Sequence, residues 1–310
     1  MATIIKLILS ILLVLSCSAC KSEVEPNIDY QEDTYRNLSL DGKEYKYNSH
    51  LVNFLVIGTD TSNDDIGQSD FIGLLSFDRE NKEINFLTLS RNAYVPIKVY
   101  DVSGEFIDWS NNHLALSYAY GKDAKSASYL TSDAVSKLLN DIPIRYITSF
   151  NLNGIEEIHD VVGSLDVVIP DDSLVFSNPL WTKGTTITLT SDNVESFVRN
   201  RDISEDFTNV NRMLRQKTYL LAYVDAVKTL LNEDFDKHAL KLEKVLSNSF
   251  TNFDLSEVEA FADMLMTYKW NTDSFYELPG NEEVGSFHDR FIVDEEALIY
   301  LVRDLFYIEK

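Results

Sequence analysis

The stretch Asn53–Tyr94 most constrains the fold, because it holds three short apolar runs separated by turn-forming residues. The runs are Phe54–Ile57, Phe71–Phe77 and Ile84–Leu89, and they are rich in branched and aromatic residues. This composition favours buried β-strands, and the glycine, serine, asparagine and aspartate residues between the runs favour turns. We therefore predict three consecutive strands of one sheet.

Three charged residues, Asp60, Asp70 and Arg91, interrupt the apolar pattern at its edges. Ligand sites in sheet proteins commonly lie at strand ends, where a stiff scaffold presents loops. Two carboxylates and one guanidinium at successive strand ends could hold a divalent cation and an anionic substrate together. Alternatively they are solvated loop residues. For Asp60 and Asp70 alone this second interpretation is favoured, because acidic residues are abundant in the chain.

Composition sets the class of protein. A chain of 310 residues with 45% hydrophobic and 25% charged residues has ordinary globular composition, and one large domain is the simplest organisation. The net charge of −23 argues against a partner that is nucleic acid and against a polybasic membrane patch. Arginines that cluster in so acidic a chain oppose the background field, so a cluster indicates a specific anion.

Both cysteines lie in the segment Met1–Cys20, where Lys6 precedes an apolar run that is short for a spanning helix. The segment has the pattern of a secretory signal that ends in a lipobox, with lipidation expected at Cys20 or, in a second register, at Cys17. An uncleaved anchor helix is the alternative. Either way we expect an extracytoplasmic protein on the outer face of the cytoplasmic membrane, held there by its N-terminal anchor. No other cysteine is present, so no disulfide framework is expected.

Residues 21–50 are polar and are interpreted as a tether, with a short edge strand as an alternative for its end, and a domain is expected at 51–310. In this domain strand-like and helical stretches alternate, which favours an α/β sandwich, α-β-α in its layers, with a central mixed sheet flanked by helices. A loop is expected at Asp101–Asn112. A helix is predicted at Ser126–Leu139, with Thr131 or Ser132 as its N-cap residue.

Four arginines fall between Arg199 and Arg215, at the end of one predicted helix and in the first turns of another that starts near Asn211. In the second helix Arg212, Arg215, Gln216 and Tyr219 share a stripe beside the apolar face, near a helix N-terminus that favours anions. Each arginine alone could simply pair with a neighbouring acidic residue. For the cluster as a set, phosphate binding is the better hypothesis.

Seven motifs, in order, resemble those of the LytR-CpsA-Psr family of cell-wall glycopolymer transferases. The family patterns are G-S-D, R-S-D, S-I-P-R-D-x-Y-V, A-Y-x-x-G-G, G-G-V-x-V, V-R-x-R and D-x-G-R-x-x-R-Q. Their counterparts here are Gly58–Asp60, Ser69–Asp70, Leu89–Val95, Tyr118–Gly121, Gly163–Val167, Val198–Arg201 and Asn209–Gln216. The resemblance covers about residues 50–230 strongly.

The resemblance implies an α/β sandwich that encloses an apolar pocket for a polyprenyl chain. It implies transfer of teichoic acid, capsule or a similar glycopolymer from a polyprenyl-pyrophosphate carrier to peptidoglycan, with Mg²⁺ or Mn²⁺ as cofactor. By position, Asp60 and Asp70 would hold the metal. The diphosphate would be bound by Arg91, Arg199, Arg201, Arg212 and Gln216. Arg91 and Asp70 would be catalytic. The sequence shows no convincing general base, and Asp70 is no more than a candidate for activating the acceptor hydroxyl.

Three departures from the family pattern remove a charged side chain. Gln68 replaces the arginine of R-S-D, Asn92 replaces the aspartate of P-R-D, and Asn209 replaces the aspartate of D-x-G-R. Two further functions therefore stay open: a non-catalytic anchored binder of polyprenyl phosphate or wall polymer, and a polyprenyl-pyrophosphate hydrolase. An active transferase is favoured, because the aspartates, the arginines named above and Gln216 all remain.

Overall fold

A computed structural model describes residues 37–310, apart from 63–64, 102, 203, 206–207, 271 and 286–288. These residues belong to one unit, Gln31–Lys310. The predicted signal segment, with Cys17 and Cys20, lies outside the described residues. Within the described part of the chain, no helix is both long and apolar enough to cross a membrane.

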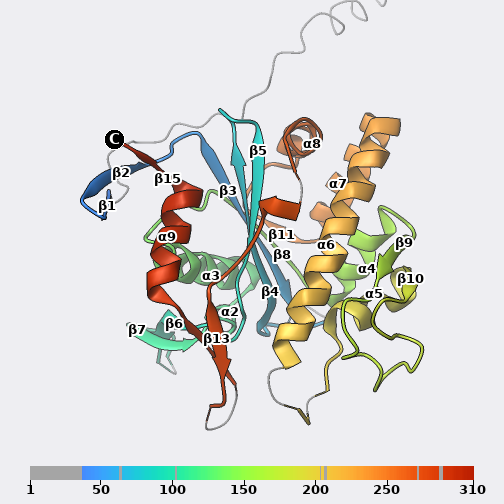
Figure 1. The fold of residues 1–310 in the computed structure, drawn as a ribbon, viewed down its shortest axis with the longest axis horizontal. Helices are drawn as coiled ribbons and strands as arrows, with labels where there is room; N and C mark the ends of the chain where they lie inside the picture. The colour runs from blue at the N-terminus through green and yellow to red at the C-terminus, as the bar shows by residue number, and fades with distance from the viewer. Residues whose placement is uncertain are drawn as a thin grey trace, which may run out of the picture. The chain divides into compact units, whose positions relative to one another are not determined.

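A six-stranded mixed sheet forms the centre of this unit, in the order β11-β8-β3-β4-β5-β12 (Figure 1). Its three middle strands are antiparallel neighbours, whereas β8 joins β3 and β12 joins β5 in parallel. The strands are β3 (Leu51–Thr59), β4 (Ser69–Asp78), β5 (Glu83–Thr88), β8 (Tyr146–Phe150), β11 (Phe250–Thr251) and β12 (Phe275–Glu277). The three strands predicted from the apolar runs are therefore confirmed. Strands β3 and β4 extend beyond their runs, whereas β5 is shifted by one residue toward the N-terminus.

Successive side chains of β3 point to opposite faces of the sheet, as they do in any β-strand. Leu51, Leu55 and Ile57 pack into the main hydrophobic core, while Phe54 and Val56 line a cavity on the opposite face. Both faces of a central strand are covered, which explains why its sequence is continuously apolar rather than alternating.

Helices cover both faces of the sheet, which confirms the predicted sandwich (Figure 1). Helices α3 and α9 lie on the face of the sheet that packs against the main core. Helices α4 to α7 lie on the opposite face, and α8 lies near one end of the sheet. The helices are α2 (Leu116–Ala119), α3 (Ala124–Leu138), α4 (Leu152–Asp160), α5 (Ser191–Arg199), α6 (Thr208–Glu233), α7 (Phe235–Ser247), α8 (Val258–Thr267) and α9 (Glu295–Phe306). Two short 3₁₀ turns, Leu255–Glu257 and Thr272–Ser274, flank α8.

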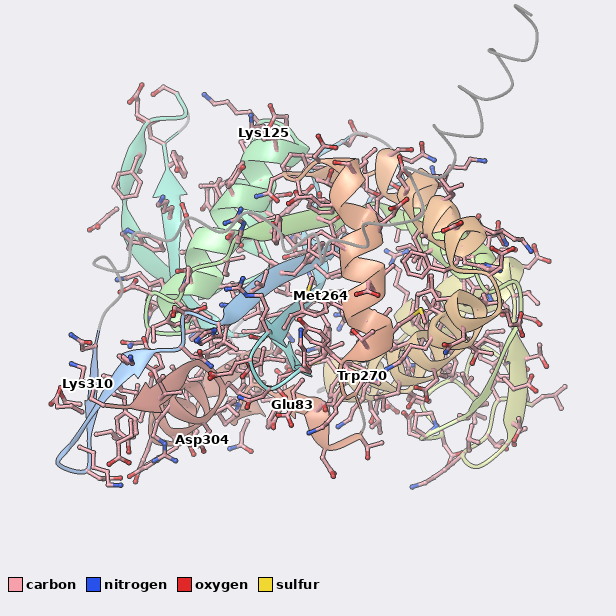
Figure 2. All side chains as sticks on the ribbon, turned by 90° about the horizontal axis from the view of Figure 1, so that it is seen from above. Glu83, Lys125, Met264, Trp270, Asp304 and Lys310 are labelled. Carbon is pink, nitrogen blue, oxygen red and sulfur yellow. The ribbon has the colours of Figure 1, made fainter. Side chains whose placement is uncertain are left out.

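Smaller sheets complete the fold. They contain β6 (Tyr94–Tyr100) with β7 (Phe106–His113), β9 (Leu165–Val168) with β10 (Thr186–Leu189), and β13 (Gly280–Glu283) with β14 (Arg290–Val293). Glu83, the first residue of β5, forms an isolated β-bridge with Lys269, which precedes Trp270 in the chain (Figure 2).

Folded structure begins before residue 51, inside the range predicted to be a tether. Strands β1 (Leu38–Leu40) and β2 (Lys43–Tyr47) pair with each other, and β2 also pairs with the C-terminal β15 (Tyr307–Glu309). These strands are part of the folded domain because the side chains of Leu38, Tyr45 and Tyr47 are buried in the main core. The sequence allowed for one short strand at the end of the tether, and the structure has two strands there.

Two local predictions are wrong. The expected loop Asp101–Asn112 is largely strand β7, which pairs with β6 although most of its side chains are exposed. Helix α3 is capped by Asp123 in a capping box with Ser126, and not by Thr131 or Ser132, which are buried inside the helix. Helix α5 begins after its N-cap residue Thr190, whose backbone N–H donates to Asn193 Oδ1 at 2.9 Å.

Candidate functional site

The predicted residues Asp60, Asp70 and Arg91 lie at one edge of the sheet. Asp60 directly follows β3, Asp70 is the second residue of β4, and Arg91 follows β5. Because these three strands are antiparallel neighbours, the end of β3, the start of β4 and the end of β5 meet at the same edge. The site therefore follows from strand order.

Asp70 is the centre of the site, because three guanidinium groups contact its carboxylate. Oδ1 lies 3.2 Å from Arg91 Nη1 and 3.4 Å from Arg212 Nη1, and Oδ2 lies 3.4 Å from Arg199 Nε. The arginines come from the β5–β6 loop, the end of α5 and the first turns of α6. Only 11% of the Asp70 side chain and 3% of the Arg212 side chain are exposed. These charges therefore interact with little screening by water.

This arrangement shifts the pKa values of both partners. Burial by itself raises the pKa of Asp70, but the charges of Arg212, Arg91 and Arg199 outweigh burial and hold it below its ordinary value. Burial lowers the pKa of Arg212 to about 10, and repulsion from Arg91 and Arg201 contributes. Asp70 is thus ionised at neutral pH and is a weak proton acceptor.

Gln68 connects Asp60 to this cluster. Its backbone N–H donates to Asp60 Oδ1 at 2.7 Å, and its side-chain Oε1 accepts a hydrogen bond from Arg91 Nη2. The glutamine that departs from the family motif therefore orients Arg91. An uncharged acceptor serves here because the guanidinium already has Asp70 as its counter-ion.

Arg199, Arg201 and Gln216 also lie around the cluster. Arg199 makes a second ion pair with Glu195 at 2.7 Å, one turn earlier in α5. Arg201 Nη1 donates to Thr208 Oγ1 at 3.4 Å, and Gln216 Nε2 donates to the carbonyl of Val198 at 3.3 Å. All five residues predicted to bind the diphosphate are therefore brought to one region, around the start of α6.

Arg215 has a different environment from Arg212, although both were placed on the same helix stripe. Its guanidinium is fully buried and donates to the carbonyls of Phe197 and Asn200 and to the hydroxyl of Ser173. Asp171 lies 3.8 Å away. Arg215 thus fastens the end of α5 to α6 and holds Arg199 in position, rather than facing a ligand.

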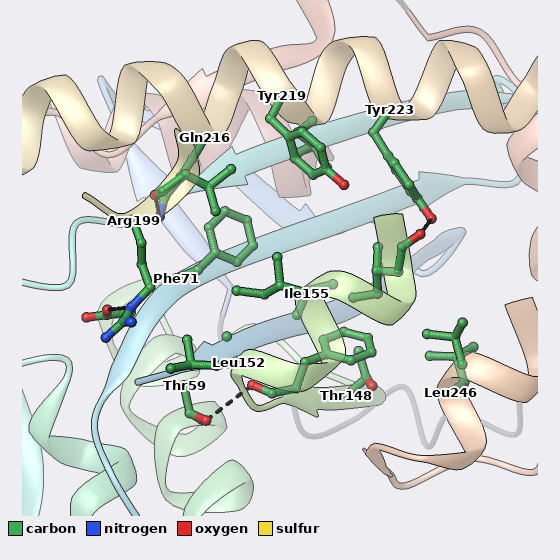
Figure 3. Close-up of a pocket in the computed structure, with 18 of the residues that line it drawn as sticks. Thr59, Phe71, Thr148, Leu152, Ile155, Arg199, Gln216, Tyr219, Tyr223 and Leu246 are labelled. Carbon is green, nitrogen blue, oxygen red and sulfur yellow. Dashed lines mark hydrogen bonds and ion pairs between the residues drawn. The ribbon is translucent and has the colours of Figure 1, made fainter. Parts of the chain in front are cut away.

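An apolar cavity of about 310 Å³ opens from this cluster into the space between the sheet and helices α4, α6 and α7 (Figure 3). Arg199 and Gln216 lie at one end of it and Leu246 of α7 lies at the other, while Tyr219 and Tyr223 project from α6 between them. The other lining residues are mostly apolar and include Phe54, Val56, Phe71, Phe150, Leu152, Ile155, Ile158, Leu220, Leu242 and Val245. One region of the fold therefore joins a cationic end to a long apolar space.

The residues present suit a magnesium ion only in combination with a substrate. Among the described residues, no group of three or more histidine, cysteine or acidic side chains could hold a metal. Asp60 and Asp70 supply two carboxylates, which is the protein share that Mg²⁺ usually takes, with phosphate oxygens and water completing its coordination. The metal prediction is thus compatible with the donor chemistry of the site.

The model of the LytR_cpsA_psr family matches residues 14–304, nearly the whole chain. The chain belongs to the LytR-CpsA-Psr family.

Several relatives are named polyisoprenyl-teichoic acid–peptidoglycan teichoic acid transferase TagU. Two from Bacillus cereus strains are 30% identical over 171 residues and 29% identical over 225 residues. These alignments span 54% and 71% of this chain, but only 50% and 66% of the relatives' own lengths. This chain therefore spans only about half to two thirds of the length of these relatives.

Solved structures share the fold of this LytR-CpsA-Psr protein. Bacillus subtilis TagV superposes with a TM-score of 0.62 at 21% identity, over 82% of this chain and 96% of TagV. A structure described as TagT bound to LI-WTA gives a TM-score of 0.61 at 20% identity, over 83% and 89% of the two chains. At these identities the likeness shows the fold alone.

Sequence reasoning about this LytR-CpsA-Psr protein missed one residue beside the site, Glu282 of β13. Its Oε1 accepts a hydrogen bond from Asn209 Nδ2 at 3.3 Å, and the Asn209 Oδ1 accepts one from Arg212 Nη2 at 2.6 Å. No motif marks Glu282, because seventy residues separate it from Arg212. Only the substitution at Asn209 signalled that a carboxylate had been lost here.

Proposed function

We propose that this chain transfers a glycopolymer from a polyprenyl-pyrophosphate carrier to peptidoglycan, and that it acts on the outer face of the cytoplasmic membrane. The observation that carries the proposal is the junction of three arginines around Asp70 with the apolar cavity behind them. A polyprenyl pyrophosphate has the same two parts, an anionic head and a long apolar chain. The names of the TagU relatives support the same reaction.

The apolar chain would occupy the cavity. Its walls are built from sheet, α4, α6 and α7, and the buried phenol groups of Tyr219 and Tyr223 point their polar atoms at His159 and at the carbonyl of Ile158. Those polar atoms are thus satisfied by the protein, and the rings present apolar surface to the lipid. Burial of each methylene group contributes about 0.8 kcal/mol, so the chain supplies much of the affinity.

The cationic end would bind the diphosphate. Arg91, Arg199, Arg201 and Arg212 offer forked donors that match phosphate oxygens, and they would neutralise the charge that develops there during transfer. The acceptor hydroxyl oxygen forms a bond to the phosphorus that carries the glycopolymer. The bond from that phosphorus to the bridging oxygen breaks, polyprenyl phosphate leaves, and the hydroxyl proton passes to a base or to solvent.

Magnesium, or manganese, would join this site as a substrate-dependent cofactor held by Asp60 and Asp70. When bound it supplies positive charge to the phosphoryl oxygens. In the structure Asp70 neutralises the arginines. We propose that the diphosphate takes over these guanidinium groups and leaves Asp70 for the cation.

The test uses the chain from Lys21 onward, which contains the whole unit Gln31–Lys310. It is incubated with a short polyprenyl-pyrophosphate-linked saccharide, a peptidoglycan oligomer and Mg²⁺, and the phosphodiester-linked product is followed by mass spectrometry. Product is expected from the wild type and should be lost in Arg91→Ala. Arg303→Ala is the matched control, because this arginine lies on α9 and pairs with its neighbour Asp304.

The two other functions give different results in the same experiment. Lipid binding without any product would identify a binding protein, the function that the amides at Asn92 and Asn209 would favour. Release of phosphate when no acceptor is present would identify a hydrolase. Either result would refute the transferase proposal.

A further inference from the structure

Glu282 is brought beside the arginine cluster by a hairpin from the C-terminal part of the chain. Strand β13 pairs with β14 so that Glu282 lies opposite Phe291. Phe291 in turn bridges Ala93, and its N–H donates to the carbonyl of Asn92 at 2.9 Å. The hairpin is therefore fixed directly to the loop that carries Arg91.

Gly280 allows this close approach. Its φ of 152° lies outside the range that other residues readily adopt, and a Cβ there would come within 2.2 Å of the carbonyl oxygen of Ile292. The two strands consequently approach closely at the base of the hairpin. The position of Glu282 is thus built into the backbone.

A chain of hydrogen bonds links Glu282 to the centre of the site. Glu282 Oε1 accepts from Asn209 Nδ2, Asn209 Oδ1 accepts from Arg212 Nη2, and Arg212 Nη1 contacts Asp70. Ser90 Oγ is a second acceptor for Asn209 Nδ2, at 3.2 Å. With its nitrogen facing these two oxygens and, at 3.6 Å, Met213 Sδ, the amide turns its oxygen to Arg212.

The carboxylate of Glu282 is held at an energetic cost. Burial raises its pKa, although hydrogen bonding from Asn209, Asn92 and Ser90 opposes this, and the charge of Asp289 raises it further. Among the described residues, its Oε2 is buried without a hydrogen-bond partner. Asp289 is the charged group that acts on it from its own hairpin, while Arg212 faces it from α6 across Asn209. Cost of this kind is typical of residues kept for function.

We propose that Glu282 is a positioning residue of the transferase site, which fixes the Asn209 amide and, through it, places and supports the charge of the Arg212 guanidinium for the diphosphate. The proposal rests on the function proposed above. It also explains a departure from the family motif: the carboxylate expected at position 209 has moved one hydrogen bond further from Arg212, to position 282.

The first arm of the test measures binding of inorganic pyrophosphate by titration calorimetry. Glu282→Gln should weaken binding about tenfold, the middle of the range for coupled residues in one hydrogen-bond network. The double variant Asn209→Asp with Glu282→Gln puts a carboxylate directly on Arg212 and should restore affinity to within about twofold. Glu283→Gln, the exposed neighbour on β13, is the matched control and should bind like the wild type.

The second arm separates a positioning role from a merely structural one. Because the folded pKa of Glu282 is raised, its charge opposes folding at neutral pH, and stability from this group increases as pH falls through that pKa. Glu282→Gln should therefore keep or raise Tm while it weakens binding. A structural role predicts a lower Tm, and a Tm that falls together with binding would overturn the proposal.

The third arm needs no substrate, so it stands even where the transferase proposal fails. The NMR signals of the Arg212 guanidinium and the Asn209 side-chain amide should titrate together with the Glu282 carboxylate and stay constant in Glu282→Gln. The inference is refuted if these signals do not change when Glu282 titrates, or if Glu282→Gln binds pyrophosphate as the wild type does. A wild type that binds no pyrophosphate refutes the transferase instead.

Discussion

Shortening the apolar cavity should weaken lipid binding in proportion to the length of the lipid. Leu246 of α7 lies at the end of the cavity away from Arg199 (Figure 3). A tryptophan at this position would fill that end without touching the arginine cluster. Leu246→Trp should therefore leave the diphosphate contacts intact and exclude only the far part of a long chain.

The expected loss of binding free energy follows from the number of lipid carbons that the tryptophan excludes from the cavity. One excluded isoprene unit has five carbons, which corresponds to about 4 kcal/mol at 0.8 kcal/mol per group. Since bound chains also lose conformational freedom, a net loss of about 3 kcal/mol is expected, or roughly a hundredfold in Kd.

The assay compares geranyl, farnesyl and geranylgeranyl pyrophosphate by calorimetry below their aggregation concentrations. The loss should grow with chain length and be smallest for the geranyl compound. Leu240→Trp is the control, because Leu240 is on the same helix but 59% exposed. An equal loss for all three lipids, or the same loss in the control, would refute the cavity as the site of the lipid chain.

Three further predictions concern the charged cluster. Arg215→Met should lower the unfolding free energy by about 3 kcal/mol in denaturant titrations, because the carbonyls of Phe197 and Asn200 lose a charged donor; an unchanged midpoint would contradict the fastening role. Because burial lowers the pKa of Arg212 to about 10, its positive charge is present below that pH and lost above it, so pyrophosphate affinity should fall between about pH 9 and 11; constant affinity to pH 11.5 would exclude Arg212 as a ligand. Asp70→Asn should tighten pyrophosphate binding without Mg²⁺ about tenfold, since the guanidiniums lose their internal counter-ion, and should remove any gain on adding Mg²⁺; weaker binding in both conditions would contradict the exchange of partners.

The part of the site that depends on local order was predictable from the sequence. Consecutive antiparallel strands necessarily bring alternate strand ends together, so Asp60, Asp70 and Arg91 could be grouped from three apolar runs alone. The helix period likewise placed Arg212 and Gln216 on one stripe of α6. Both inferences use contacts between neighbours in the chain or in a meander.

The remainder depends on partners that no local pattern specifies. Arg212 and Arg215 were predicted to lie on the same stripe of α6. In the structure Arg215 donates to carbonyls at the end of α5, whereas Arg212 pairs with Asp70. Strand β7 was missed because an exposed hairpin shows little apolar alternation. Glu282 was missed because its role exists only through the packing of β14 on Ala93.

The local charge of the site runs against the charge of the whole chain, and this contrast has a physical consequence. A net charge of −23 slows the approach of dissolved anions, yet at the sheet edge three guanidiniums share the single carboxylate of Asp70. Among the described residues, the buried Nε atoms of Arg91 and Arg212 have no hydrogen-bond partner, so donors for an anion are already in place. An anion tethered to an apolar chain does not depend on long-range attraction, because the cavity supplies its affinity. The site should therefore bind a diphosphate carried by lipid more tightly than a soluble one, which is held by the arginines alone.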